Sequence, residues 1–198
     1  MAAGASIITI VSNARILLGL EPINALEEDV TGLAANFWDT VRQSTIRMGS
    51  WASCRKRKLL LPEATAPDWG WAYKFILPSD YLRVISVGEN DEAIEYEIEG
   101  TDTGTVLLSD EAEIKLRYCF DNKAPGTWDA ILVEACTFHL AALAAYTATG
   151  STTLQQSMQS NFAATLALAR GVNAGEAPVD RMGDRPVRWS RYSGSGRW

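Results

Sequence analysis

Residues 33–61 contain a change of hydrophobic period that constrains the fold more than any other feature. Apolar side chains recur every three or four positions up to residue 48, which predicts one buried face of a long helix. That face comprises Leu33, Ala34, Phe37, Trp38, Val41, Thr45, Ile46 and Met48. Gly49 is expected to end the helix, four solvated cations follow at 55–58, and the apolar run 59–61 begins a strand. The stretch therefore predicts a junction between a helical layer and a β-rich layer.

A first helix and a capping pattern precede this junction. Residues 7–18 show helical spacing of apolar side chains, and Gly19 is expected to end that helix. Asn24 and Glu27 have the spacing of a capping box, which would begin the second helix and place Glu28 and Asp29 at its positive end. The three carboxylates therefore predict a capped, solvated helix start rather than a catalytic pair.

The hydrophobic period is two between residues 59 and 120, which predicts five or six short antiparallel strands in a small sheet or sandwich. Turn residues at 78–80 and 88–91 separate the runs. One run alternates apolar residues with glutamates, which predicts a half-buried strand with an acidic face. Its members are Ile94, Tyr96 and Ile98 against Glu95, Glu97 and Glu99.

The helical period returns after residue 126. Thr127 is expected to cap a helix over 128–149, and Ser151 or Thr152 a fourth helix that ends near 170–171. Both helices are rich in alanine and almost free of charge. Such surfaces predict helices that are packed on several sides, either within the fold or against other copies.

Together these patterns predict an α+β fold, a bundle of about four antiparallel helices with a small antiparallel β-domain inserted between helices 2 and 3. Residues 1–58 and 123–175 would form the bundle, 59–122 the β-domain, and 176–198 an extended C-terminal arm. The arm has no hydrophobic period and interleaves arginine with aromatic residues, the types that dominate interface hot spots. We predict that it docks on a partner through Arg185, Arg188, Trp189, Arg191, Tyr192, Arg197 and Trp198.

Composition excludes several classes of protein. The net charge of −6 over 198 residues argues against a general nucleic-acid binder, because neutralising phosphates requires an excess of cations. Three cysteines are too few, and an odd number, for a disulfide scaffold. The N-terminus has no cationic flank before its apolar residues, so no signal peptide is expected. The charge-free run 135–169 is broken by Gly150 and by Gln and Asn residues, so no membrane span is expected.

Few residues could carry chemistry. Cys136 and His139 lie one helical turn apart, but a zinc site would also need Cys54 and Cys119 from separate elements. Buried core cysteines and a hydrogen-bonded histidine are the preferred interpretation. The three glutamates of 95–99 lack a ligand loop for a divalent cation. No phosphate-binding glycine loop or nucleophile elbow is present. The sequence therefore predicts no catalytic residue, no metal and no cofactor.

Five short motifs follow one another along the chain. They are Arg15-Ile-Leu-Leu-Gly-Leu-Glu-Pro-Ile, Trp38-Asp-x-Val-Arg42, Trp51-Ala-x-Cys-x-Lys-Arg, Trp71-Ala-Tyr73 and Leu77-Pro-Ser-Asp80-Tyr-Leu-Arg83-Val. In this order and spacing they resemble the tail tubular protein A family of tailed bacteriophages, the head-to-tail adaptors or gatekeepers. The resemblance covers residues from about 7 to 170, with Trp38, Arg42, Trp51 and Trp71 as structural anchors.

The resemblance implies a virion structural protein of the phage tail or neck that is made in the bacterial host cytoplasm and is not an enzyme. Members form a ring, usually of twelve copies, between the portal protein and the next tail component, a nozzle or tail tube. Genomic DNA passes through the lumen without sequence-specific binding, and no membrane is involved.

Two other functions are compatible with the residues. A nucleic-acid-binding module could use the basic block 55–58 together with the Arg/Trp arm, since bases stack on tryptophan beside arginine. An enzyme such as a hydrolase would need two carboxylates in one cleft, and no pair in the sequence is favoured for that role.

Overall fold

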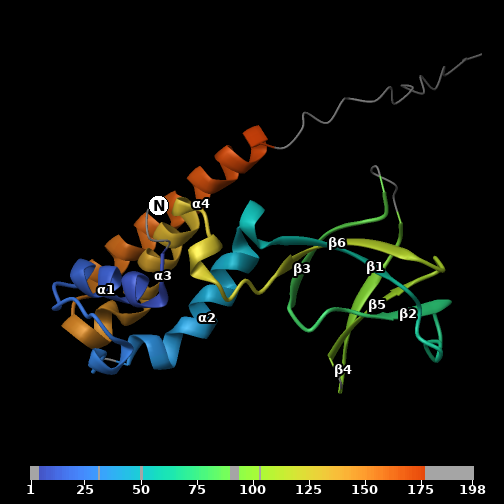
Figure 1. Cartoon of the computed structure of the whole chain (residues 1–198), viewed down its shortest axis with the longest axis horizontal. Coiled ribbons are helices and arrows are strands. Elements are labelled where there is room, and N and C mark those ends of the chain that lie inside the picture. Colours follow the sequence, from blue (N-terminus) through green and yellow to red (C-terminus); the bar gives the residue numbers. More distant parts are fainter. Residues whose placement is uncertain (1–4, 31, 50, 90–93, 103, 177–198) are drawn as a thin grey trace, which may run out of the picture.

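The computed structural model describes residues 5–30, 32–49, 51–89, 94–102 and 104–176. Four helices form one end of the molecule and six strands form the other, with the strands inserted between the second and third helices (Figure 1). This arrangement confirms the predicted α+β fold. The helices are α1 (Ile7–Leu17), α2 (Leu33–Met48), α3 (Ala130–Thr149) and α4 (Thr152–Glu176).

Helix α1 begins and ends where the sequence predicts. The Ser6 hydroxyl accepts a hydrogen bond from the Thr9 amide, which caps the helix, and Gly19 adopts a positive φ of 74° after its last turn. Ile10, Val11 and Ala14 are fully buried, as the spacing of apolar residues requires. The predicted first helix is therefore confirmed.

The start of α2 differs from the predicted capping box. Residues Leu26–Glu28 form a separate 3-10 turn, and Gly32, at a φ of 67°, precedes Leu33. Asp29 provides the cap instead, because its Oδ2 accepts a hydrogen bond of 2.8 Å from the Ala34 amide. Its Oδ1 pairs with the buried Arg15 guanidinium at 3.1 Å. The prediction based on Asn24 and Glu27 was wrong because a tertiary ion pair, invisible in the local pattern, positions the cap.

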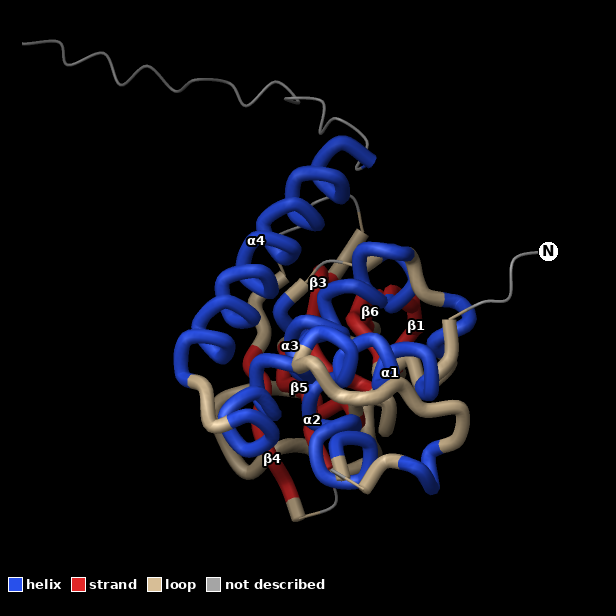
Figure 2. Tube along the Cα trace, turned by 90° about the vertical axis from the view of Figure 1, so that its left-hand side faces the viewer, coloured by secondary structure: helices blue, strands red, loops and turns tan. Residues whose placement is uncertain are grey.

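Helix α3 is the centre of the bundle. It packs against α1, α2 and α4, and Figure 2 shows it among these helices. Its small side chains Ala135, Ala141, Ala144 and Ala145 are fully buried, so the neighbouring helices approach closely. Helix α3 is also the one helix of the described chain that is long and apolar enough to span a membrane, and half of that apolar stretch is buried inside the fold.

The ends of α3 and α4 correct two predictions. Asp129 rather than Thr127 caps α3, because its Oδ1 accepts from the Leu132 amide at 2.8 Å while Thr127 belongs to a preceding 3-10 turn. Ser151 caps α4 as predicted, accepting from the Leu154 amide. Helix α4 continues past Gly171 to Glu176. A glycine inside a helix costs only about 1 kcal/mol, which is too little to end a helix by itself.

The strands form two antiparallel sheets that pack face to face. Strands β1 (Arg55–Leu60), β6 (Ile114–Phe120) and β3 (Tyr81–Val87) form sheet A in the order β1-β6-β3. Strands β2 (Tyr73–Ile76), β5 (Gly104–Ser109) and β4 (Glu97–Thr101) form sheet B in the order β2-β5-β4. Residues of both sheets share one hydrophobic cluster, so the predicted small β-domain is a sandwich. The cluster comprises Leu60, Phe75, Leu77, Val87, Leu107, Ile114, Leu116 and Tyr118.

Two strands differ from their predictions. The basic block 55–58, expected before a strand at 59–61, forms the first four residues of β1 and pairs with β6. Strand β4 begins at Glu97 rather than near Ile94, and every residue of it is exposed, Ile98 included. As the last strand of its sheet, β4 has only β5 beside it, so its apolar side chains receive less cover than the alternating pattern suggests.

A buried ion pair joins the two parts of the molecule. Arg42 on α2 donates to both carboxylate oxygens of Asp121, which directly follows β6, at 2.7 and 3.0 Å. The two side chains are only 5% and 8% exposed. Burial alone would lower the pKa of Arg42, but the hydrogen bonds to Asp121 and Asp39 outweigh it and raise the pKa. Arg42 therefore stays charged between the helices and the sandwich.

Three tryptophans lie where the helices and the strands are connected. Trp51 is buried and donates from its indole nitrogen to the Thr45 carbonyl at 3.0 Å, so the chain turns back on the end of α2. Gly49 is needed for this turn because a Cβ there would lie 2.2 Å from the Trp51 ring. Trp38 stacks on Trp128 with ring centroids 5.9 Å apart. Both chain connections between helices and strands are thus fixed by large buried side chains.

Removing Arg42 should be far more costly than removing its exposed partner. Arg42→Met leaves the Asp121 carboxylate buried and unpaired, so the free energy of unfolding should fall by about 3–5 kcal/mol in urea denaturation. Asp39→Asn is the matched control, since Asp39 is 79% exposed and its pair should contribute no more than about 1 kcal/mol. Equal losses for the two variants would contradict a structural role for the buried pair.

Candidate functional site

The only histidine of the chain is a core residue. The Nδ1 atom of His139 is hydrogen-bonded to the Thr45 hydroxyl at 2.8 Å, and its ring stacks on Phe162 at a centroid distance of 4.3 Å. Burial lowers the pKa of His139 below its ordinary value of 6.5. The imidazole is therefore neutral near pH 7 and joins α2, α3 and α4, in keeping with a hydrogen-bonded core histidine.

The three cysteines are buried and free. Burial raises the pKa of Cys54 and of Cys136 to about 12, and it also raises the pKa of Cys119. A thiol that holds its proton at neutral pH is a poor nucleophile and a poor metal ligand. Among the described residues, no group of three or more His, Cys, Asp or Glu side chains could hold a metal ion.

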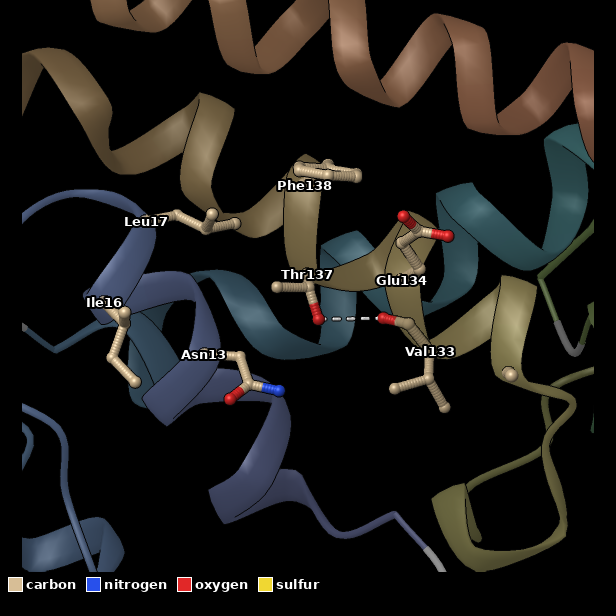
Figure 3. Close-up of a pocket in the computed structure, with 8 residues that line it drawn as sticks. Asn13, Ile16, Leu17, Val133, Glu134, Thr137 and Phe138 are labelled. Carbon is tan, nitrogen blue, oxygen red and sulfur yellow. Dashed lines mark hydrogen bonds between the residues drawn. The ribbon is translucent and has the colours of Figure 1, made fainter.

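An open apolar groove of about 370 Å³ lies between α1 and α3 (Figure 3). The Thr137 hydroxyl donates to the Val133 carbonyl within its wall, and Glu134 supplies its one ionisable side chain. A single carboxylate cannot divide acid and base roles, so the groove has no catalytic pair. It is lined by Asn13, Ile16, Leu17, Ala130, Val133, Glu134, Thr137 and Phe138.

The basic block 55–58 is divided between the two faces of sheet A. Lys56 and Lys58 are paired with Tyr118 and Leu116, so they lie on the side of the sandwich core. The Lys56 ammonium is held by Asp80 at 2.7 Å and lies over the Phe120 ring. Arg55 and Arg57 are on the opposite, outer face. The four cations therefore do not form one continuous basic stripe.

The outer face of sheet A gains arginines from other strands. Register places Arg57 directly opposite Arg117 on β6, and Cys119 lies between Arg55 and Arg83 of the flanking strands. The Arg83 guanidinium donates to the Gly49 carbonyl at the end of α2, 2.8 Å away. Sequence reasoning missed Arg117, although the alternation within 113–120 already placed it on the polar side of that strand.

Sheet B presents the opposite charge. Glu97 and Glu99 are opposite Leu108 and Val106 of β5, and these residues face away from the sandwich core that contains Leu107. The Trp71 indole nitrogen donates to Glu97 at 3.1 Å. Trp71 lies just before β2 and is partly exposed. The glutamates thus form an exposed face on a sheet edge, with one position fixed by a tryptophan.

The C-terminal half of helix α4 exposes small and apolar side chains, whereas its N-terminal half exposes polar ones. Met158, Leu166 and Ala169 are buried against the bundle. The exposed face of the C-terminal half carries small or apolar side chains, and Leu143 and Tyr146 of α3 are exposed as well. The exposed residues of α4 include Ala163, Ala164, Ala167, Leu168 and Val172. The predicted multi-sided packing within one copy therefore applies to α3, whereas α4 is covered on one side.

The predicted docking residues of the arm lie outside the described residues. These are Arg185, Arg188, Trp189, Arg191, Tyr192, Arg197 and Trp198. Of the four structural anchors named from the sequence, three are buried where the helices meet the strands, namely Trp38, Arg42 and Trp51. The fourth, Trp71, lies on the β-domain and is only partly buried.

Comparison with known proteins gives no family assignment. No family model matches the chain, and no curated protein matches it significantly.

The half-buried, neutral His139 should make the free energy of unfolding depend on pH in a single window. The unfolded chain binds a proton that the folded chain excludes, so the free energy of unfolding should fall as pH drops below about 6.5, by at most about 1.4 kcal/mol per pH unit. Urea denaturation at about pH 7.5 and about pH 5.5 measures this loss. His139→Gln removes the titrating group, and the loss should then be smaller. An unchanged pH dependence in that variant would contradict the assignment.

Proposed function

We propose that this protein is a subunit of a head-to-tail adaptor ring of a tailed bacteriophage, located between the portal and the next tail component. The observation that carries the proposal is the chain order, in which a β-domain interrupts a helical bundle between its second and third long helices. The family that the sequence motifs resemble has this same order. The role is structural, and genomic DNA passes through the centre of the ring.

The exposed surfaces support an assembling protein. Helix α4 leaves Leu168 and Val172 uncovered, and the groove between α1 and α3 is open and apolar. Apolar surface left outside the core is typical of contact regions between protein copies. The net charge of −6 also suits a wall around moving DNA, since a strongly basic lumen would retain phosphates.

A nucleic-acid-binding module is the second candidate. The observation in its favour is the Arg57–Arg117 pair on the outer face of sheet A. Against it, Lys56 is held by Asp80, and Lys56 and Lys58 lie on the other face of the strand. Affinity for DNA grows with the number of phosphates that cations neutralise, so one pair of arginines supports only weak binding.

Sedimentation velocity tests the proposal directly. The purified protein is analysed alone and after mixing with the portal ring encoded in the same genome, before and after nuclease treatment. An adaptor should co-sediment with the portal in a fixed stoichiometry that nuclease leaves unchanged, and the mass of the complex gives the copy number. If the protein does not bind the portal but its sedimentation coefficient rises when DNA is added at low salt, the result would instead support the nucleic-acid-binding module.

Deletion of residues 177–198 tests the arm. The cut follows the last residue of α4, so the free energy of unfolding of the remaining chain should stay within about 0.5 kcal/mol of the full-length value. Association with the portal or with other copies should weaken, because the deletion removes two tryptophans and five arginines. Unchanged assembly by the shortened chain would remove the arm from the proposal.

A further inference from the structure

Two arginines face each other on the outer surface of sheet A, and no residue of the described chain supplies them with a counter-charge. Arg57 on β1 is the direct register partner of Arg117 on β6, and like charges in this position destabilise a sheet. Neither guanidinium has an ion-pair or hydrogen-bond partner within the part of the chain that the structure describes. The repulsion would be relieved by an anionic group from another molecule.

The rest of this face determines what can reach the pair. At one end the sheet is covered by α2, where the Cys119 thiol lies 3.5 Å from the Ile46 carbonyl and Arg83 is bonded to Gly49. At the other end Leu59 is 52% exposed, beside Lys115, which is ion-paired with Glu89. We call Arg57, Arg117 and Leu59 the basic face. It combines positive charge with an uncovered apolar side chain.

The opposite side of the sandwich carries the complementary surface. Glu97 and Glu99 project from the outer side of β4. On the same side of sheet B, Ile76 is 53% exposed and is the register partner of the buried Val106. Lys74 also lies on this side, across Leu108 from Glu97, so Glu99 is the carboxylate with no cation in its own row of the three strands. We call Glu97, Glu99 and Ile76 the acidic face. The Trp71 hydrogen bond to Glu97 holds one of its carboxylates in place.

We propose that the basic face of one copy binds the acidic face of a second copy, so that the β-domains form the lateral contact of the assembly. This inference rests on the proposed function, since it names the surface through which ring subunits meet. Carboxylates of Glu97 and Glu99 pair with the two guanidiniums, and Ile76 meets Leu59. The acidic face thus supplies carboxylates to the guanidiniums of the basic face, and each face covers an exposed apolar side chain of the other.

The two faces point in opposite directions, and this determines the symmetry of the contact. A copy that uses its basic face still presents its acidic face to a further copy, so the contact is head-to-tail and not self-complementary. Head-to-tail contacts build rings when the rotation between copies closes. DNA phosphates fit the basic face less well, because two cations on a chain of net charge −6 supply little counterion release.

Charge reversal on each face provides the test. Arg57→Glu and Glu99→Lys are compared with the unmodified protein by sedimentation velocity, with and without the portal ring and with a short DNA duplex. Lys58→Glu is the matched control, because it makes the same change of charge on the next residue but on the other face of β1. All three side chains are exposed, so the variants should fold, which circular dichroism verifies.

The expected pattern is specific to a head-to-tail contact. Each of Arg57→Glu and Glu99→Lys should weaken self-association at least about tenfold, whereas Lys58→Glu should not. An equimolar mixture of the first two variants should regain assembly, since every interface in an alternating ring then joins opposite charges. The chain that carries both reversals should also regain it.

Three other results would overturn the inference. Reversals that weaken association no more than Lys58→Glu would exclude the basic face from the contact. Loss without recovery in the mixture would exclude the pairing of the two faces. Loss of duplex binding by Arg57→Glu with unchanged self-association would identify phosphate as the ligand.

The portal measurements separate this inference from the proposed function. If all variants join the portal ring as the unmodified protein does, the β-domain contact is wrong and the adaptor role stands. If charge reversal and recovery behave as expected but no form of the protein binds the portal, the contact stands and the adaptor role is wrong.

Discussion

The buried pair of Arg42 and Asp121 is the interaction on which the relation between helices and strands depends. Asp121 is the residue at which the chain leaves β6, and its amide also donates to the Asp80 carbonyl at 2.7 Å. Asp80 in turn accepts hydrogen bonds from the Lys56 ammonium and the Tyr118 hydroxyl. Burial alone would raise the pKa of Asp80, but these two hydrogen bonds keep that pKa below its usual value. One short segment therefore connects α2, β1, β6 and the turn before β3. Because the desolvated charges must remain paired, the sandwich has little freedom to move away from the bundle.

The sequence predicted most elements because their hydrophobic periods arise from local burial. It could not predict contacts that depend on where distant segments meet. Asp29 looked like a solvated residue of a first turn, but Arg15 from α1 takes it into a buried ion pair. The extent of β4 was also beyond local reasoning, because alternation of isoleucine and glutamate is the same whether a strand lies inside a sheet or at its edge.

The candidate surfaces were still less accessible from the sequence. The basic block 55–58 is continuous in the chain, yet a strand divides consecutive side chains between two faces. The partner that Arg57 acquires is Arg117, sixty positions away, and only the register of β1 against β6 brings them together. The core positions of Cys136 and His139 were easier to foresee, because small residues in an almost uncharged helix predict a core environment.

The Asn122 side chain has a consequence for how this chain can evolve. Its amide nitrogen donates to the Ser53 carbonyl at 2.9 Å and to the Thr127 hydroxyl at 2.9 Å. The Asn122 side chain therefore bridges the point where the chain leaves the helices and the point where it returns to them. The sandwich is thus a loop of the chain that is closed at its base. The entropic cost of closing a loop rises only slowly with the length of the loop. Sheet B and the turns can thus change in length without moving the ends that the helices must meet, whereas β3 and β6 of sheet A are held on α2 through Arg83 and Cys119.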